Sequence, residues 1–103
     1  MKWKNTDGWD LSDMTAKVAM SDSYALKADE KRPIIAFACS AASKTLTLGL
    51  ADGQGAIIMN TGGTNAVTVK NVSGDSGTSV AAGKVALVIG STTANGSSVA
   101  VLN

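Results

Sequence analysis

The residues with the clearest potential for catalysis are Gly74-Asp75-Ser76-Gly77, a pattern that also surrounds the nucleophile in one class of serine protease. A serine of that kind needs a histidine to take its proton, and the 103-residue sequence contains no histidine. The two carboxylates of the C-terminal region, Asp52 and Asp75, both fall in predicted turns, and nothing marks them as an acid–base pair for glycoside hydrolysis. A turn between strands explains these residues, so we expect no catalytic residue and no enzymatic activity.

Residues that suggest metal or phosphate binding are also better explained as turns. The pattern of Asn5 to Asp10 faintly resembles a calcium loop, but the first and twelfth ligand positions of such a loop would be Trp3 and Met14, which cannot coordinate calcium. Gly53-Gln54-Gly55 and Gly83-Lys84 lack the strand–glycine–helix context of a phosphate-binding loop. We therefore expect neither a bound metal ion nor a cofactor.

Charge is distributed unevenly along a chain whose formal net charge is only +1. Residues 1–33 hold most of the charged side chains, whereas residues 34–103 are rich in Ser, Thr, Asn and Gly. The few charged residues of 34–103 are isolated from one another; they are Lys44, Asp52, Lys70, Asp75 and Lys84. Because there is no basic stripe, we expect neither nucleic acid nor an anionic membrane as a partner. The change in composition near Pro33 predicts a boundary between an N-terminal arm, residues 1–33, and a β-domain, residues 34–103.

The single cysteine, Cys39, lies in the apolar run Ile34–Cys39. A lone cysteine excludes an intramolecular disulfide, and its apolar neighbours predict a buried, inert thiol. The first four residues, Met1 to Lys4, lead into polar sequence without the apolar segment of a signal peptide. No apolar run is long enough to span a bilayer. These features predict a soluble protein made in a reducing cytoplasm.

Two tryptophans, Trp3 and Trp9, lie within the first nine residues, although aromatic residues make up only 4% of the chain. Residues Asn5 to Gly8 between them have the composition of a turn. One interpretation is a flexible or loosely docked terminus. The other is a docking arm, because tryptophan is enriched where protein surfaces bury one another.

The remainder of the arm is compatible with short helical turns. Ser12-Asp13 can cap a helix over residues 14–20, and residues 24–31 can form a further turn or two before Pro33 ends it. Both segments are too short to be stable helices alone, so an extended arm with brief helical turns is the alternative. The candidate docking residues of the arm are Trp3, Trp9, Met14 and Tyr24.

From residue 34 onward, apolar and polar residues alternate with the period of β-strands. The clearest signal is the turn segment Asn60–Asn65, whose Gly62-Gly63 pair predicts positive φ and a β-hairpin between its flanking strands. Such turn segments separate every pair of candidate strands. The predicted strands are 34–39, 45–50, 56–60, 66–72, 78–81, 84–89 and 98–102. This pattern predicts an all-β fold, an antiparallel β-sandwich or barrel of about seven short strands, preceded by the charged N-terminal arm.

The predicted β-domain has few large side chains for its core. Phe37 is its only aromatic residue, and Ala, Val, Leu and Ile fill the strands. A thin core gains burial when copies of the chain associate, and strand edges without charges are protected when an assembly covers them. The composition therefore favours self-association.

Four stretches of the β-domain resemble the β-rich domain of tailed-bacteriophage head fibre and capsid decoration proteins. The resemblance covers about residues 34–103, and residues 1–33 match no family in this way. The absence of an extended repeat or collagen-like shaft favours a compact decoration protein over a long fibre. The stretches are T-L-T-L-G-L-A-D-G-Q (45–54), N-T-G-G-T-N-A-V-T-V-K-N-V (60–72), G-K-V-A-L-V-I-G-S-T-T-A-N (83–95) and S-V-A-V-L-N (98–103).

The resemblance implies a non-enzymatic structural protein on the outside of a phage capsid, made in the host cytoplasm and usually assembled as a homotrimer. In such proteins the N-terminal segment commonly attaches to the major capsid protein, which assigns the candidate residues of the arm to capsid docking. The alternative is a phage tail-fibre or receptor-binding module that recognises glycans. A third, bacterial, β-module with a small-molecule or enzymatic role is disfavoured because the chain lacks histidine.

Overall fold

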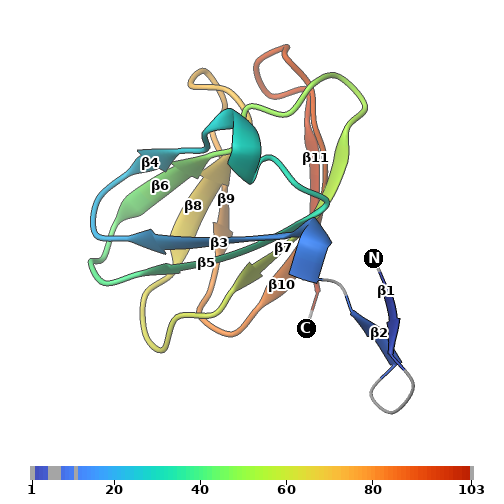
Figure 1. The fold of residues 1–103 in the computed structure, drawn as a ribbon. Coiled ribbons are helices and arrows are strands. Elements are labelled where there is room, and N and C mark those ends of the chain that lie inside the picture. Colours follow the sequence, from blue (N-terminus) through green and yellow to red (C-terminus); the bar gives the residue numbers. More distant parts are fainter. Residues whose placement is uncertain (1, 5–7, 11, 103) are drawn as a thin grey trace.

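A computed structural model of the protein describes residues 2–4, 8–10 and 12–102. Two β-sheets pack face to face and form the body of the molecule, and a separate two-stranded sheet, β1 (Lys2–Lys4) with β2 (Gly8–Asp10), projects from it (Figure 1). The five-stranded sheet has the order β11 (Ser98–Leu102), β10 (Val85–Ile89), β7 (Gly55–Asn60), β5 (Ile34–Cys39), β3 (Thr15–Met20). The four-stranded sheet has the order β4 (Tyr24–Ala25), β6 (Lys44–Thr47), β8 (Val67–Lys70), β9 (Thr78–Val80). Single 3₁₀ turns are η1 (Ser12–Met14) and η2 (Ala28–Glu30).

The chain crosses from one sheet to the other after each of its first strands. Strands β3, β5 and β7 lie in the five-stranded sheet and are parallel, and β4, β6 and β8 lie in the four-stranded sheet and are also parallel. The chain thus winds three times around the core. Each winding passes through one strand of each sheet, and successive windings lie side by side. The last strands reverse this pattern, because β9 is antiparallel to β8, and β10 is antiparallel to both β7 and β11.

Side chains of alternating residues from both sheets meet in one core. Phe37 and Ile35 of β5 are completely buried, as are Leu46 of β6 and Val67 of β8. Cys39 is a free thiol and is buried, as the sequence predicted. Strands with one buried face keep a strict register, because a shift of one residue would turn the core residues outward.

All seven predicted strands of the β-domain are present, at or near the predicted bounds. The fold is β-rich with two packed sheets, but it is not a closed barrel, and the antiparallel arrangement predicted for it is only partly correct. Both sheets are mixed. Antiparallel pairing holds for β8 with β9 and for β10 with its two neighbours, whereas the other pairs within the two sheets are parallel. Alternation of apolar and polar residues shows which face of a strand is buried, and it is the same for parallel and antiparallel partners.

The segment Asn60–Asn65 is not the turn of a β-hairpin. Strands β7 and β8 on either side of it belong to different sheets, so the segment is a crossover between layers. Gly62 and Gly63 do not adopt positive φ. The Asn60 side chain bonds locally by accepting the Gly62 N–H at 3.0 Å. It also donates to the carbonyls of Asn65 and Val80, both at 2.9 Å, and so ties the crossover to β9.

The predicted helix over residues 14–20 is wrong, because residues Thr15–Met20 form β3. Ala16, Val18 and Met20 are buried and the residues between them are exposed, which is the period of a strand. Parallel pairing with β5 stabilises these residues more than a short isolated helix would, because nucleating a short helix in water is unfavourable. The predicted arm therefore contributes β3 and β4 to the two sheets instead of standing wholly outside them.

Candidate interaction surfaces

The candidate docking residues lie in three different parts of the structure. The register of β1 with β2 places Trp3 opposite Trp9 in the two-stranded sheet outside the body (Figure 1). Met14 ends η1, just before β3, and is half-buried. Tyr24 lies in β4, in the other sheet. The turn predicted for residues 5–8 falls largely outside the described residues. The structure therefore pairs the two tryptophans and separates Tyr24 from them.

Tyr24 has a structural role that the sequence did not suggest. Its ring packs against the edge of the core, and its hydroxyl donates to both carboxylate oxygens of Glu30, at 2.8 and 3.0 Å. The Glu30 carboxylate also accepts the Lys27 N–H at 2.7 Å, and this bond, with the one from Tyr24, lowers the pKa of Glu30. The hydrogen bond to Glu30 raises the pKa of Tyr24. Tyr24 thus holds η2 against β4.

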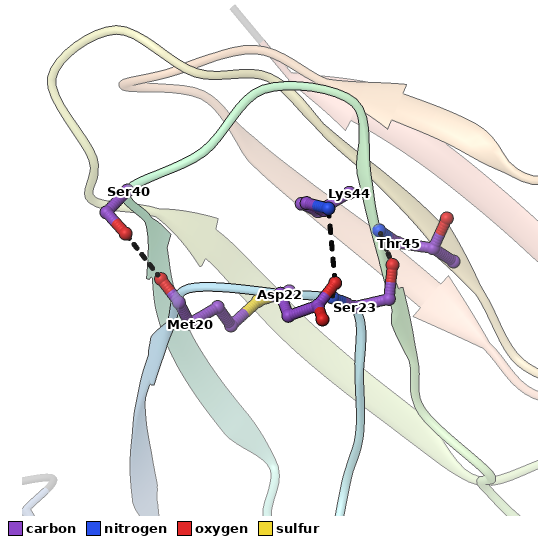
Figure 2. Close-up of polar contacts among 6 residues, drawn as sticks. All are labelled: Met20, Asp22, Ser23, Ser40, Lys44 and Thr45. Atoms are coloured by element: carbon purple, nitrogen blue, oxygen red, sulfur yellow. Dashed lines mark hydrogen bonds and ion pairs between the residues drawn. The ribbon is translucent and has the colours of Figure 1, made fainter.

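Polar contacts join the segment that follows β3 to the segment that follows β5 (Figure 2). The Ser40 N–H donates to the Met20 carbonyl at 2.9 Å, and the Thr45 N–H donates to the Ser23 hydroxyl at 3.1 Å. Lys44 forms an ion pair with the exposed carboxylate of Asp22 at 3.2 Å. The Ser23 N–H and then Lys44 lower the pKa of Asp22. An exposed ion pair of this kind contributes little to stability. Together, these contacts hold the segment after β3 in place against the segment after β5.

The carboxylate of Asp75 organises the loops at one end of the two sheets. It is buried, and it accepts the N–H groups of Asn95 at 2.6 Å, Asn71 at 2.9 Å and Val72 at 3.2 Å. The bonds from Asn95 and then Asn71 lower the pKa of Asp75. Ser76 is exposed, and its N–H donates to the Asn95 side chain at 2.7 Å. A small cavity of about 120 Å³ borders these groups. Gly74–Gly77 is thus a loop whose aspartate binds backbone amides.

The hydrogen bonds of Asp75 predict a loss of stability in acid. Because the folded-state pKa lies below the ordinary value of 3.8, the ionised carboxylate stabilises the fold fully above that value. This contribution disappears as the pH falls through the lower folded-state pKa. We expect Asp75→Asn to lower the free energy of unfolding by about 1–2 kcal/mol near neutral pH.

Urea unfolding at a series of pH values checks this prediction. The difference between wild type and Asp75→Asn is expected to shrink as the pH falls below about 4, because the unfolded chain then binds a proton at Asp75 while the folded protein does not. The charge contributes nothing once the pH lies below the lower folded-state pKa and both side chains are uncharged. A difference that stays constant from neutral pH to about pH 2.5 would show that the charge of Asp75 does not contribute to stability.

The outer faces of the two sheets differ in chemistry. Outward residues of the four-stranded sheet are polar, with Thr45 on β6, Thr68 on β8 and Ser79 on β9 at paired positions. The five-stranded sheet is mostly apolar on its outer face, with Lys17 of the edge strand β3 as a charged exception. The described large apolar side chains that remain exposed all belong to its strands β7, β10 and β11. Ile57, Leu87, Ile89 and Leu102 lie on the outer face, whereas Val101 pairs with the buried Ala86 and lies on the inner side of the edge strand.

Val85, Leu87 and Ile89 share one face of β10. The structure shows that this face is the outer one, since Ala86 and Val88 between them are buried. Sequence reasoning thus missed an apolar surface. One feature of the sequence could have revealed this surface: the larger apolar residues of β10 alternate with smaller ones.

Among residues 2–4, 8–10 and 12–102, no group of three or more His, Cys, Asp or Glu side chains is placed to hold a metal ion. The helical segments of these same ranges include none that is long and apolar enough to cross a membrane. Comparisons with protein-family models, curated proteins and solved structures found no match to this chain.

Proposed function

We propose that the protein is a structural component of a phage virion, a capsid decoration or cement protein related to head fibres. It binds the outer surface of the capsid through the major capsid protein and stabilises the shell. It acts without catalysis, and copies of the chain associate, with a homotrimer as the expected state. The resemblance of residues 34–103 to phage head fibre and decoration domains is the basis for assigning the protein to a capsid.

The observation that carries the docking part of the proposal is the position of the tryptophans. The register places Trp3 opposite Trp9 in a two-stranded sheet that lies outside the body (Figure 1). A two-stranded sheet alone is marginally stable in water, so this one gains most by packing on another surface. Tryptophan is among the residues that contribute most binding energy at protein interfaces. We therefore assign the contact with the shell to β1 and β2, with Met14 at the base of this segment.

Capsid binding by a tryptophan variant tests the proposal. Heads purified from a phage that lacks the gene for this chain are mixed with the protein and sedimented. We expect Trp3→Ala/Trp9→Ala to bind at least about 100-fold more weakly than wild type, because each interface tryptophan typically contributes about 2 kcal/mol or more. Deleting residues 1–31 would be a poor substitute, since it also removes β3 and β4 from the sheets.

Trp3→Phe/Trp9→Phe is the matched control, because it keeps an aromatic ring at both positions. It is expected to retain part of the affinity. If the alanine variant binds heads as tightly as wild type, the arm is not the docking element. If wild type ignores the heads and binds glycans on an array, the receptor-binding alternative replaces capsid decoration.

A further inference from the structure

The self-association proposed above requires a surface, and the outer face of β7, β10 and β11 has the properties of one. Register aligns the side chains of this face across the three strands. Leu87 lies opposite Ile57 on β7 and Ala100 on β11, and Val85 lies opposite Met59 and Leu102. Leu87 is 45% exposed and Ile57 is 40% exposed. Water therefore reaches a continuous apolar surface in the isolated chain.

The distribution of residue sizes on β10 is the reverse of that expected for a sheet with one wet face. In such a sheet the outward positions are polar and the larger apolar residues face the core. On β10, however, the outward residues Leu87 and Ile89 are larger than the buried Ala86 and Val88. Leaving a leucine or isoleucine exposed forfeits the part of its burial free energy that the exposed area would supply. A partner that covers this face recovers that free energy.

The outer face of the four-stranded sheet provides an internal comparison. Its paired outward positions Thr45, Thr68 and Ser79 carry hydroxyl groups, and Lys70 adds a charge. Both outer faces belong to short strands of the same small domain, yet only one is polar. The apolar character of the other face is therefore specific to that sheet and does not follow from the overall composition.

The charge of the apolar face favours a second copy of the chain as its occupant. The outward positions of β5, β7, β10 and β11 contain no ionisable residue, and Lys17 on the edge strand β3 is the charged residue of this face. Copies of this face meet without buried like charges and without an unpaired charge at the centre, which are the main costs of bringing identical surfaces together. A strongly charged partner would find no complementary group here.

The free edge of the sheet lies beside the same surface. Strand β11 has five residues, with neither a charge nor a proline to block pairing with another chain. The other described sheet edges of the body are protected, because β4 and β9 have two and three residues and β3 carries Lys17. An assembly that covers the apolar face also shields the β11 edge.

The face is large enough to form the apolar centre of a contact between copies. Its three strands, about 4.8 Å apart and about 17 Å long, give a footprint on the order of 250 Å² in projection. Side-chain relief makes the accessible area larger than the projection, and a standard interface buries about 800 Å² per partner. Monomeric proteins rarely leave an apolar patch of more than a few hundred Å² uncovered.

From these observations we infer that the outer face of β7, β10 and β11 packs against a second copy of the chain. The inference rests on the self-association that belongs to the proposed function, and it names the surface responsible. Leu87 lies at its centre, between Ile57 and Ala100.

The test compares the solution mass of three full-length proteins by analytical ultracentrifugation, without capsids, from about 1 to 100 μM. We expect wild type to sediment as a multiple of the 10.3 kDa chain. Leu87→Lys is expected to dissociate about 100-fold more readily, because it buries a charge in the contact. Thr68→Lys, the matched substitution on the polar outer face, is expected to keep the wild-type mass. Leu87→Thr replaces Leu87→Lys if the lysine variant does not fold, and it is expected to weaken association by about tenfold.

The outcomes separate this inference from the proposed function. A monomeric wild type, or an oligomeric Leu87→Lys that is correctly folded by circular dichroism, would overturn the assigned surface. Dissociation of Thr68→Lys to the same extent would also overturn it, because the effect would not depend on the face. Capsid sedimentation of the same proteins is read separately. Loss of head binding by an oligomeric Leu87→Lys would mean that the face contacts the shell instead of a second copy.

Discussion

Phe37→Ala is expected to lower the free energy of unfolding by about 4 kcal/mol, the largest effect of any single substitution predicted for this protein. Phe37 is the only phenylalanine in the chain and is completely buried. It lies in β5, whose neighbours in the sheet are β3 and β7. Most of the surrounding core residues are small or medium-sized, so no neighbour is large enough to fill the space that the ring leaves.

The magnitude follows from two contributions. Removing the ring forfeits the transfer free energy of its carbons, and the sheet on either side cannot collapse into the resulting cavity without breaking strand pairs. A domain of this size has a total stability of about 5–15 kcal/mol, so the variant is expected to be marginally folded.

Urea unfolding followed by circular dichroism measures this effect, at one protein concentration for all variants because self-association also adds to apparent stability. Phe37→Leu is the matched control, since it keeps an apolar side chain at the position, and is expected to cost about 1–1.5 kcal/mol. A loss of less than about 1.5 kcal/mol in Phe37→Ala would show that the core at this position is loosely packed.

Asn60→Ala is expected to lower the free energy of unfolding by about 3 kcal/mol. Asn60 is 1% exposed, and its amide makes three hydrogen bonds, two of them to the carbonyls of Asn65 and Val80. The alanine variant leaves the Val80 carbonyl buried without this donor, and a buried polar group without a partner costs about 1–3 kcal/mol. It also releases the crossover between β7 and β8 from β9.

Asn65→Ala is the matched control, because Asn65 lies in the same crossover but is half-buried and donates one hydrogen bond, to the Cys39 carbonyl at 2.9 Å. It is expected to cost about 1 kcal/mol. Thermal or urea unfolding of the two variants provides the comparison. Equal losses for Asn60→Ala and Asn65→Ala would contradict the idea that the buried amide of Asn60 organises the crossover.

The local alternation of residue types was sufficient to predict where the strands of the β-domain lie. Residues 34–39 and 98–102 are strands at the predicted bounds, and the buried positions of Phe37 and Cys39 follow from the apolar run that contains them. These features depend on the period of two along a single strand and on turn-forming residues between strands. Both are visible within a window of a few residues.

The N-terminal region shows why local patterns fail at other positions. Residues 15–20 place apolar side chains at Ala16, Val18 and Met20, which suits a strand, while Met14 and Val18 have the spacing of a helix. The choice depends on β5, whose parallel edge accepts β3. No property of the six residues alone reports the presence of that edge.

The candidate docking residues also depended partly on the sequence and partly on the tertiary structure. The sequence identified Trp3 and Trp9 as residues suited to docking, and the capsid role assigned to them stays a prediction. The structure added that they are partners across one small sheet. It also gave Tyr24 a partner within the chain, Glu30, and so separated it from the docking residues.

By itself the sequence determined the number and approximate bounds of the β-domain strands, the side chains that share a face, and the absence of a histidine-dependent site. Only the tertiary structure decided that the Asn60–Asn65 segment crosses between sheets, that most early strands are parallel, and that Leu87 faces outward. The physical reason is that side-chain alternation specifies two faces for each strand. Which face becomes the core, and which strand lies alongside, depends on contacts between residues far apart in the chain.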